Sequence, residues 1–93
     1  MDAEIKEHIM EHIYAKFGDN VILGPSYNPI IFVDTEGNSY KVEIYRINNQ
    51  RYLEIRTLEG ELIYNKYIPN KATLFGMIDE AFNQFGPPPS FIY

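Results

Sequence analysis

The sequence predicts an α+β fold in which a helix near each end of the chain packs on one face of an antiparallel sheet. Three observations lead to this prediction. Residues 3–17 and 70–85 repeat apolar side chains every third or fourth position, as amphipathic helices do. Residues 30–68 alternate apolar and polar side chains, as half-buried strands do. Turn signals at 35–38, 48–49 and 59–60 divide this stretch into four strands. The expected architecture is a two-layer sandwich with the order α-(β)-β-β-β-β-α.

The chain has 93 residues, which suffices for one hydrophobic core, so residues 1–86 are predicted to form a single domain. The sequence contains no cysteine, which fits a reducing compartment. It begins with acidic residues rather than a signal peptide and has no apolar run of about 18 residues. We therefore expect a soluble, cytoplasmic protein with no membrane segment.

The first helix is predicted from the stripe formed by Ile5, Ile9, Ile13 and Phe17. Asp2 is placed to cap its first turn, and Gly18 is placed to end it. The second helix is predicted to begin after Pro69-Asn70 and to end at Gly86, with its apolar face formed by Leu74, Ile78, Ala81, Phe82 and Phe85.

The four strands form a meander, and residues 21–23 offer a fifth strand that the sequence leaves undecided. A two-residue loop at Asn48-Asn49 pairs Ile47 with Gln50, which places Glu43 opposite Glu54; a four-residue loop would instead pair Glu43 with Arg56. Pairing Asp34 with Ser39 and Leu58 with Glu61 completes the register. The core face is then expected to contain Ile31, Val33, Tyr40, Val42, Ile44, Leu53, Ile55, Thr57, Leu62 and Tyr64.

The opposite face of the sheet is expected to be rich in apolar and aromatic side chains. It carries Ile30, Phe32, Tyr45, Tyr52, Ile63 and Tyr67 among charged residues. Three explanations remain open: an ordinary exposed face with paired tyrosines, a homodimer or partner interface, or cover by residues 20–29 or by the C-terminal tail. The candidate interface residues are Phe32, Tyr45, Tyr52, Arg56, Ile63, Tyr67, Phe91 and Tyr93.

Residues 87–93 form a proline-rich apolar tail. Three consecutive prolines favour an extended segment, which ends in Phe91-Ile92-Tyr93. An apolar tripeptide is expected to dock, either on its own chain or on a sister subunit or another protein.

One motif suggests metal chemistry. His8, Glu11 and His12 match the H-x-x-E-H spacing in which two histidines one helical turn apart bind zinc and the glutamate activates water. A third ligand would have to come from elsewhere, with Glu80 the nearest candidate. Three fixed positions recur often by chance, so the sequence favours a solvated polar flank of the first helix, and we expect no catalytic residue, metal or cofactor.

Charge argues against nucleic acid as the partner. The net charge is -5, which repels phosphate backbones at long range. Tyr45, Tyr52 and Tyr67 offer rings on which single-stranded bases stack, but Glu43 and Glu54 lie among them. The sequence therefore favours a small, non-enzymatic interaction protein, regulatory or inhibitory, that forms a homodimer or binds another protein. Nucleic-acid binding through the aromatic face is the alternative.

Overall fold

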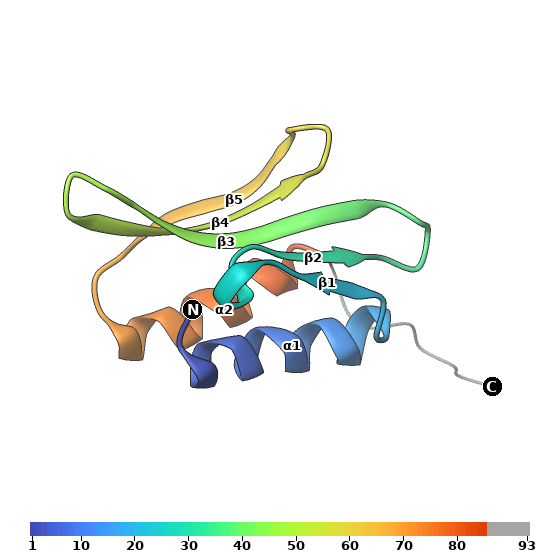
Figure 1. The fold of residues 1–93 in the computed structure, drawn as a ribbon, viewed down its shortest axis with the longest axis horizontal. Coiled ribbons are helices and arrows are strands. Elements are labelled where there is room, and N and C mark those ends of the chain that lie inside the picture. Colours follow the sequence, from blue (N-terminus) through green and yellow to red (C-terminus); the bar gives the residue numbers. More distant parts are fainter. Residues whose placement is uncertain (86–93) are drawn as a thin grey trace.

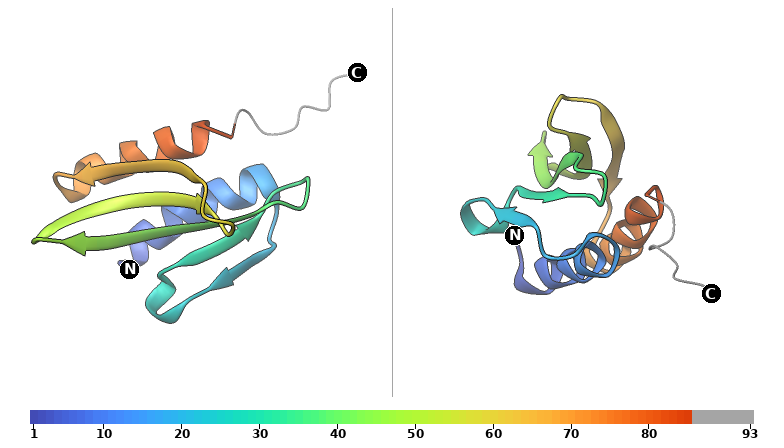
Figure 2. Two further views of the ribbon diagram at one scale, coloured as in Figure 1. Left: turned by 90° about the horizontal axis from the view of Figure 1, so that it is seen from above. Right: turned by 90° about the vertical axis from the view of Figure 1, so that its right-hand side faces the viewer.

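The computed structural model describes residues 1–85, which form a sheet layer and a helix layer (Figure 1). The elements, in chain order, are α1 (Ala3–Phe17), β1 (Val21–Leu23), the 3-10 turn η1 (Pro25–Tyr27), β2 (Ile30–Val33), β3 (Ser39–Ile47), β4 (Gln50–Thr57), β5 (Leu62–Ile68) and α2 (Lys71–Asn83). The five strands form one antiparallel sheet in chain order, and both helices lie on the same face of it (Figure 2). The predicted fold class is confirmed.

The N-terminal helix has the predicted boundaries. The Asp2 carboxylate accepts a hydrogen bond of 2.8 Å from the backbone N–H of Glu4, and Gly18 ends the helix with a φ of 87°. This cap and a contact with Lys71 lower the pKa of Asp2. The apolar stripe is buried, as expected for a helix that covers a sheet.

The C-terminal helix begins at the predicted cap. The Asn70 side chain accepts a hydrogen bond of 2.8 Å from the N–H of Thr73. The helix itself ends at Asn83, whereas the predicted stop at Gly86 and the whole tail at 87–93 lie outside the described residues. The helices run side by side in the same direction, because Lys71 bonds Asp2 at one end and the rings of Phe17 and Phe85 lie 5.4 Å apart at the other (Figure 1).

The long hairpin of β3 and β4 has a two-residue loop, which is one of the two alternatives that the sequence left open. Ile47 pairs with Gln50, and Glu43 lies opposite Glu54. Asn48 and Asn49 both have positive φ values, which asparagine tolerates better than most residues. The core-facing side chains predicted for β4 are therefore correctly placed.

The predicted register of β2 is wrong by one residue. Val33, rather than Asp34, pairs with Ser39, because Asp34 belongs to the turn and accepts hydrogen bonds from the N–H groups of Glu36 and Asn38. A shift of one residue exchanges the two faces of a strand. Ile30 and Phe32 are therefore fully buried, whereas Ile31 and Val33 point away from the helices.

A bulge alters the start of β5. The pairing changes from Ile55 with Tyr64 to Arg56 with Leu62, which leaves Ile63 as the extra residue. Leu62, which was predicted for the core, is consequently 50% exposed. Ile63 is partly buried and packs against the core.

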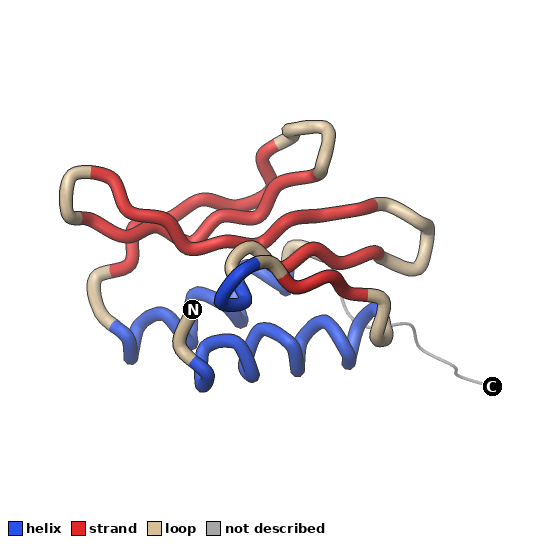
Figure 3. Tube along the Cα trace, in the orientation of Figure 1, coloured by secondary structure: helices blue, strands red, loops and turns tan. Residues whose placement is uncertain are grey.

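Residues 21–23 do form a strand, β1, which pairs with β2 (Figure 3). The segment that follows also stabilises β3. β2 covers only the first part of β3, and beyond that part the Asn28 side chain donates to the carbonyl of Ile44 at 2.8 Å and accepts from its N–H at 3.1 Å. One amide side chain thus replaces the backbone of a neighbouring strand.

Candidate functional site

A row of three tyrosines crosses the sheet on the face away from the helices, which we call the outer face. Tyr45, Tyr52 and Tyr67 are cross-strand partners on β3, β4 and β5. The rings of Tyr45 and Tyr52 are stacked with centroids 5.5 Å apart, and those of Tyr52 and Tyr67 meet edge to face at 6.0 Å. Such contacts fix the rings relative to one another. We call these residues the tyrosine row.

A polar network lies beside the tyrosine row on the same face. The Asn65 amide donates to the hydroxyl of Tyr45 at 2.7 Å and to the carboxylate of Glu54 at 2.8 Å. Glu54 is only 7% exposed, and it also accepts a bond of 2.8 Å from Arg56. Because each buried polar group here has a partner, the network holds Tyr45 in one position.

The like charges that face each other between β3 and β4 are compensated along each strand. Lys41 lies 3.4 Å from Glu43, and Arg56 bonds Glu54, so each cation pairs with an anion two residues away. This arrangement explains why the hairpin tolerates Glu43 opposite Glu54. The outward side chains of β3 and β4 thereby carry two positive and two negative charges.

The outer face also has an aliphatic margin, which the sequence analysis missed in part. Ile22 of β1 is 65% exposed, and it lies beside Ile31 of β2. The one-residue shift of β2 puts Ile31 on this face. An Asp side chain often caps such turns, so assigning Asp34 to the turn would have placed Ile31 on the outer face.

The structure brings together only part of the predicted interface. Tyr45, Tyr52, Tyr67 and Arg56 share the outer face. Phe32 does not belong there, because it is fully buried in the core. Ile63 is at the bulge, and Phe91 and Tyr93 lie outside the described residues.

A second cluster lies between the helices. The Nε2 atoms of His8 and His12 lie 2.7 Å and 2.6 Å from the same Oδ1 atom of Asp79 on α2. The three ligand-type atoms are within 4.8 Å of one another. The sequence favoured a solvated polar flank of α1, whereas the structure shows the two histidines partly buried and bonded to α2. Their side chains are only 27% and 24% exposed, because they turn toward α2.

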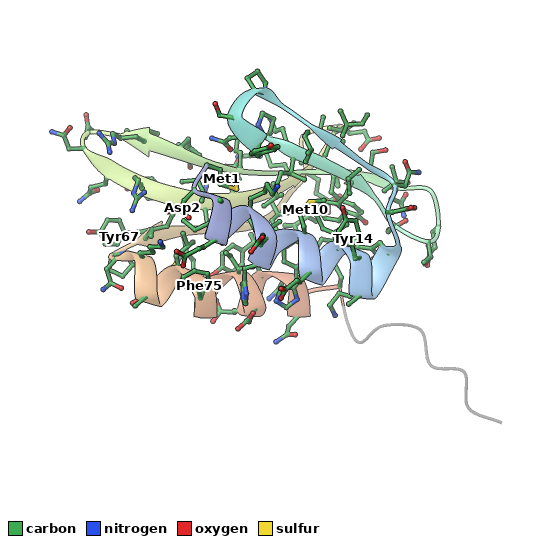
Figure 4. The ribbon with its side chains drawn as sticks, turned by 60° about the horizontal axis from the view of Figure 1, so that its bottom comes forward. Met1, Asp2, Met10, Tyr14, Tyr67 and Phe75 are labelled. Atoms are coloured by element: carbon green, nitrogen blue, oxygen red, sulfur yellow. The ribbon has the colours of Figure 1, made fainter. Side chains whose placement is uncertain are left out.

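Aromatic rings hold both histidines in place. The ring of His8 meets Phe75 edge to face at 5.1 Å, and that of His12 stacks on Phe82 at 5.2 Å. Figure 4 shows the two helices from the side away from the sheet, with Phe75 on α2. Partial burial raises the pKa of Asp79, but the hydrogen bonds from His12 and His8 outweigh it, so that this pKa lies below its ordinary value.

Glu80, the predicted third ligand, has other partners. Its carboxylate bonds Lys66 and the hydroxyl of Tyr64, and these contacts lower its pKa. Successive helical residues point about 100° apart, which explains why Asp79 rather than Glu80 faces the histidines.

No family model, curated protein or solved structure matches this chain. Among the described residues, neither helix combines the length and the apolar character needed to cross a membrane.

Proposed function

We propose that this chain is a small, cytoplasmic, non-enzymatic interaction protein that binds a second copy of itself through the outer face of the sheet. The observation that supports this proposal is the tyrosine row, which is held by ring contacts and by the Glu54–Asn65 network on a face that no described helix covers (Figure 1). Tyrosine is enriched at protein interfaces because it contributes a large contact area while losing few rotatable bonds on binding.

Charge balance favours a second copy as the occupant. The whole chain has a net charge of -5, so two copies repel each other at long range. On β3 and β4 of the outer face, however, the charges of Lys41, Arg56, Glu43 and Glu54 sum to zero. Two copies that meet through this face therefore bring together strand surfaces without net charge.

The exposed apolar and aromatic side chains of this face offer surface that a second copy could bury. Burial of about 600 Å² of apolar surface is worth on the order of 15 kcal/mol before association costs. Much of this gain is lost to association entropy and to polar desolvation. What remains is consistent with a dimer of micromolar or tighter affinity. The non-enzymatic part of the proposal rests on the lack of cysteine and on the presence of just two histidines, both in α1.

The first prediction concerns association. The wild-type chain is expected to sediment as a dimer at about 100 µM, well above a micromolar dissociation constant. Tyr67→Glu should give folded monomer, because Tyr67 is 48% exposed and a charge there would have to be desolvated on pairing. Tyr14→Glu is the matched control, since Tyr14 is 51% exposed but lies on α1. Sedimentation equilibrium measures all three proteins.

Two outcomes would contradict a dimer formed through the outer face. A wild-type chain that stays monomeric at this concentration would leave the outer face to a foreign protein. A Tyr14→Glu variant that dissociates as fully as Tyr67→Glu would show that the contact uses the helix layer instead. Circular dichroism of each variant establishes that it is folded.

The second prediction concerns nucleic acid. Binding to single-stranded or duplex DNA or RNA should be weaker than about 10 µM at physiological salt, which is the non-specific range. The reason is that Lys41 and Arg56 are already paired with Glu43 and Glu54. Fluorescence anisotropy with labelled oligonucleotides tests this. A sub-micromolar complex that weakens steeply with added salt would favour base stacking on the tyrosine row instead.

A further inference from the structure

The cluster between the helices has the composition of a transition-metal site. Two imidazoles on successive turns of α1 and one carboxylate on α2 converge on a single point from two separate elements. Imidazole and carboxylate ligands suit Zn²⁺ and its neighbours in the first transition row, whereas Ca²⁺ and Mg²⁺ prefer sites built from oxygen atoms alone. We propose that His8, His12 and Asp79 bind one divalent transition-metal ion, of which Zn²⁺ is the representative case.

The distances are those of a hydrogen-bonded site that is close to metal-binding geometry. Ligand atoms around a tetrahedral zinc lie about 2.0–2.1 Å from the metal and hence roughly 3.3 Å from one another. The three ligand-type atoms lie within 4.8 Å of one another, so the two imidazole nitrogens must approach each other by up to about 1.5 Å when the ion binds. The Nε2–Oδ1 distances are 2.7 Å and 2.6 Å, so Asp79 must withdraw from each ring by less than about 1 Å. Its side chain is 52% exposed, which gives it room to do so.

The proton inventory also fits. An ionised carboxylate only accepts hydrogen bonds, so both Nε2 atoms carry a hydrogen when they bond Oδ1 of Asp79. When the ion binds, a neutral ring transfers its proton from Nε2 to Nδ1 through water, whereas a ring protonated on both nitrogens releases its Nε2 proton to water; in either case the Nε2 lone pair becomes available to the ion and Nδ1 carries the remaining hydrogen. The hydrogen bonds from the two rings to Asp79 are thereby replaced by stronger bonds to the ion, which Asp79 also binds through its carboxylate.

The surroundings restrict the rings to this arrangement. Phe75 and Phe82 pack against His8 and His12 respectively, so ordering the imidazoles costs little when the ion binds. Three protein ligands at a partly exposed seam leave at least one position of a tetrahedral ion for water. Bound metal therefore crosslinks α1 to α2 on the side of the molecule away from the tyrosine row.

The experiment uses the full chain without a His tag. Zn²⁺ should bind with one ion per chain and a dissociation constant on the order of 1 µM by isothermal titration calorimetry. It should raise the thermal midpoint in a concentration-dependent way that EDTA reverses. The chain has two histidines, so their imidazole NMR signals report the site directly, and both should shift with zinc but not with Mg²⁺.

Two variants separate this site from the H-x-x-E-H motif. Asp79→Asn keeps the shape of the side chain and should weaken zinc binding by about 10-fold or more, as loss of a ligand does. Glu11→Gln is the matched control, because it removes an acidic residue of α1 that is not among the three ligands, and affinity should change by less than about threefold.

Three results would overturn the proposal. The first is that folded wild-type protein does not bind Zn²⁺ at 100 µM, about two orders of magnitude above the expected dissociation constant. The second is that Glu11→Gln and Asp79→Asn weaken zinc binding equally. The third is that zinc shifts the NMR signals of one imidazole only. The first would identify the cluster as a hydrogen-bonded pin between the helices. NMR detection on the wild type avoids dependence on the folding of any variant.

Discussion

Replacing Phe32 with alanine is expected to lower the free energy of unfolding by about 3 to 5 kcal/mol. Phe32 is fully buried, and its ring lies within 5.3 to 5.8 Å of four other aromatic rings, from Phe17, Tyr40, Phe82 and Phe85. These rings come from α1, from α2 and the turn that follows it, and from β3. The deletion would therefore leave a cavity that no single element can close by moving.

Ile31→Ala is the matched control for this prediction. Ile31 is the adjacent residue of β2, but it faces outward and is partly exposed. Its replacement should cost about 1 kcal/mol or less. Urea unfolding at constant slope measures both variants. Equal costs for the two positions would contradict the register of β2 and would return Phe32 to the outer face.

Replacing Asn65 with leucine is expected to cost about 1 to 3 kcal/mol. The amide of Asn65 is a hydrogen-bond donor to both Glu54 and Tyr45, and a leucine of similar volume supplies no donor. Glu54 would then keep Arg56 as a partner but lose its second bond at a site where it is 7% exposed. A buried carboxylate with fewer partners is unfavourable because water does not replace the lost bond.

The double variant Glu54→Leu with Asn65→Leu tests this explanation. When both partners of a buried polar contact become apolar, no group is left unsatisfied and much of the cost disappears. Arg56 is 36% exposed and is solvated when Glu54 is removed. The double variant should therefore be more stable than Asn65→Leu alone in urea unfolding. If the two costs simply add, the network does not act as a unit.

The features that depend on local sequence were predictable. Both helix starts follow from the capping residues Asp2 and Asn70, whose side chains bond N–H groups within the next three residues. The sequence left open whether the loop at Asn48-Asn49 has two or four residues, but both alternatives keep the same side chains on each face of the hairpin. The structure has the two-residue loop, which pairs Tyr45 with Tyr52. A hairpin turn fixes which side chains face each other, so that the alternation alone then places the tyrosine row.

The features that depend on longer-range contacts were not predictable. The register of β2 is an exception, because its error came from local contacts: the Asp34 side chain bonds the N–H groups of Glu36 and Asn38 and so belongs to the turn, as an Asp before such a turn often does. The metal-type cluster depends on how α2 is rotated against α1. Apolar spacing locates the buried face of a helix only approximately, so it could not distinguish Asp79 from Glu80.

The position of the two helices has a consequence for how the chain folds. Each hairpin joins strands that are neighbours in sequence, but the contact between His8 and Asp79 spans 71 residues and encloses the whole sheet. Contacts between residues so far apart in sequence form late, because the entropy cost of closing a long loop comes before the contacts can stabilise the chain. On the ribosome, α1 is synthesised before α2, so it cannot make its contacts with α2 until most of the chain has been made. Until then the stripe of Ile5, Ile9 and Ile13 lacks the part of the core that α2 supplies, and incompletely covered apolar surface favours aggregation.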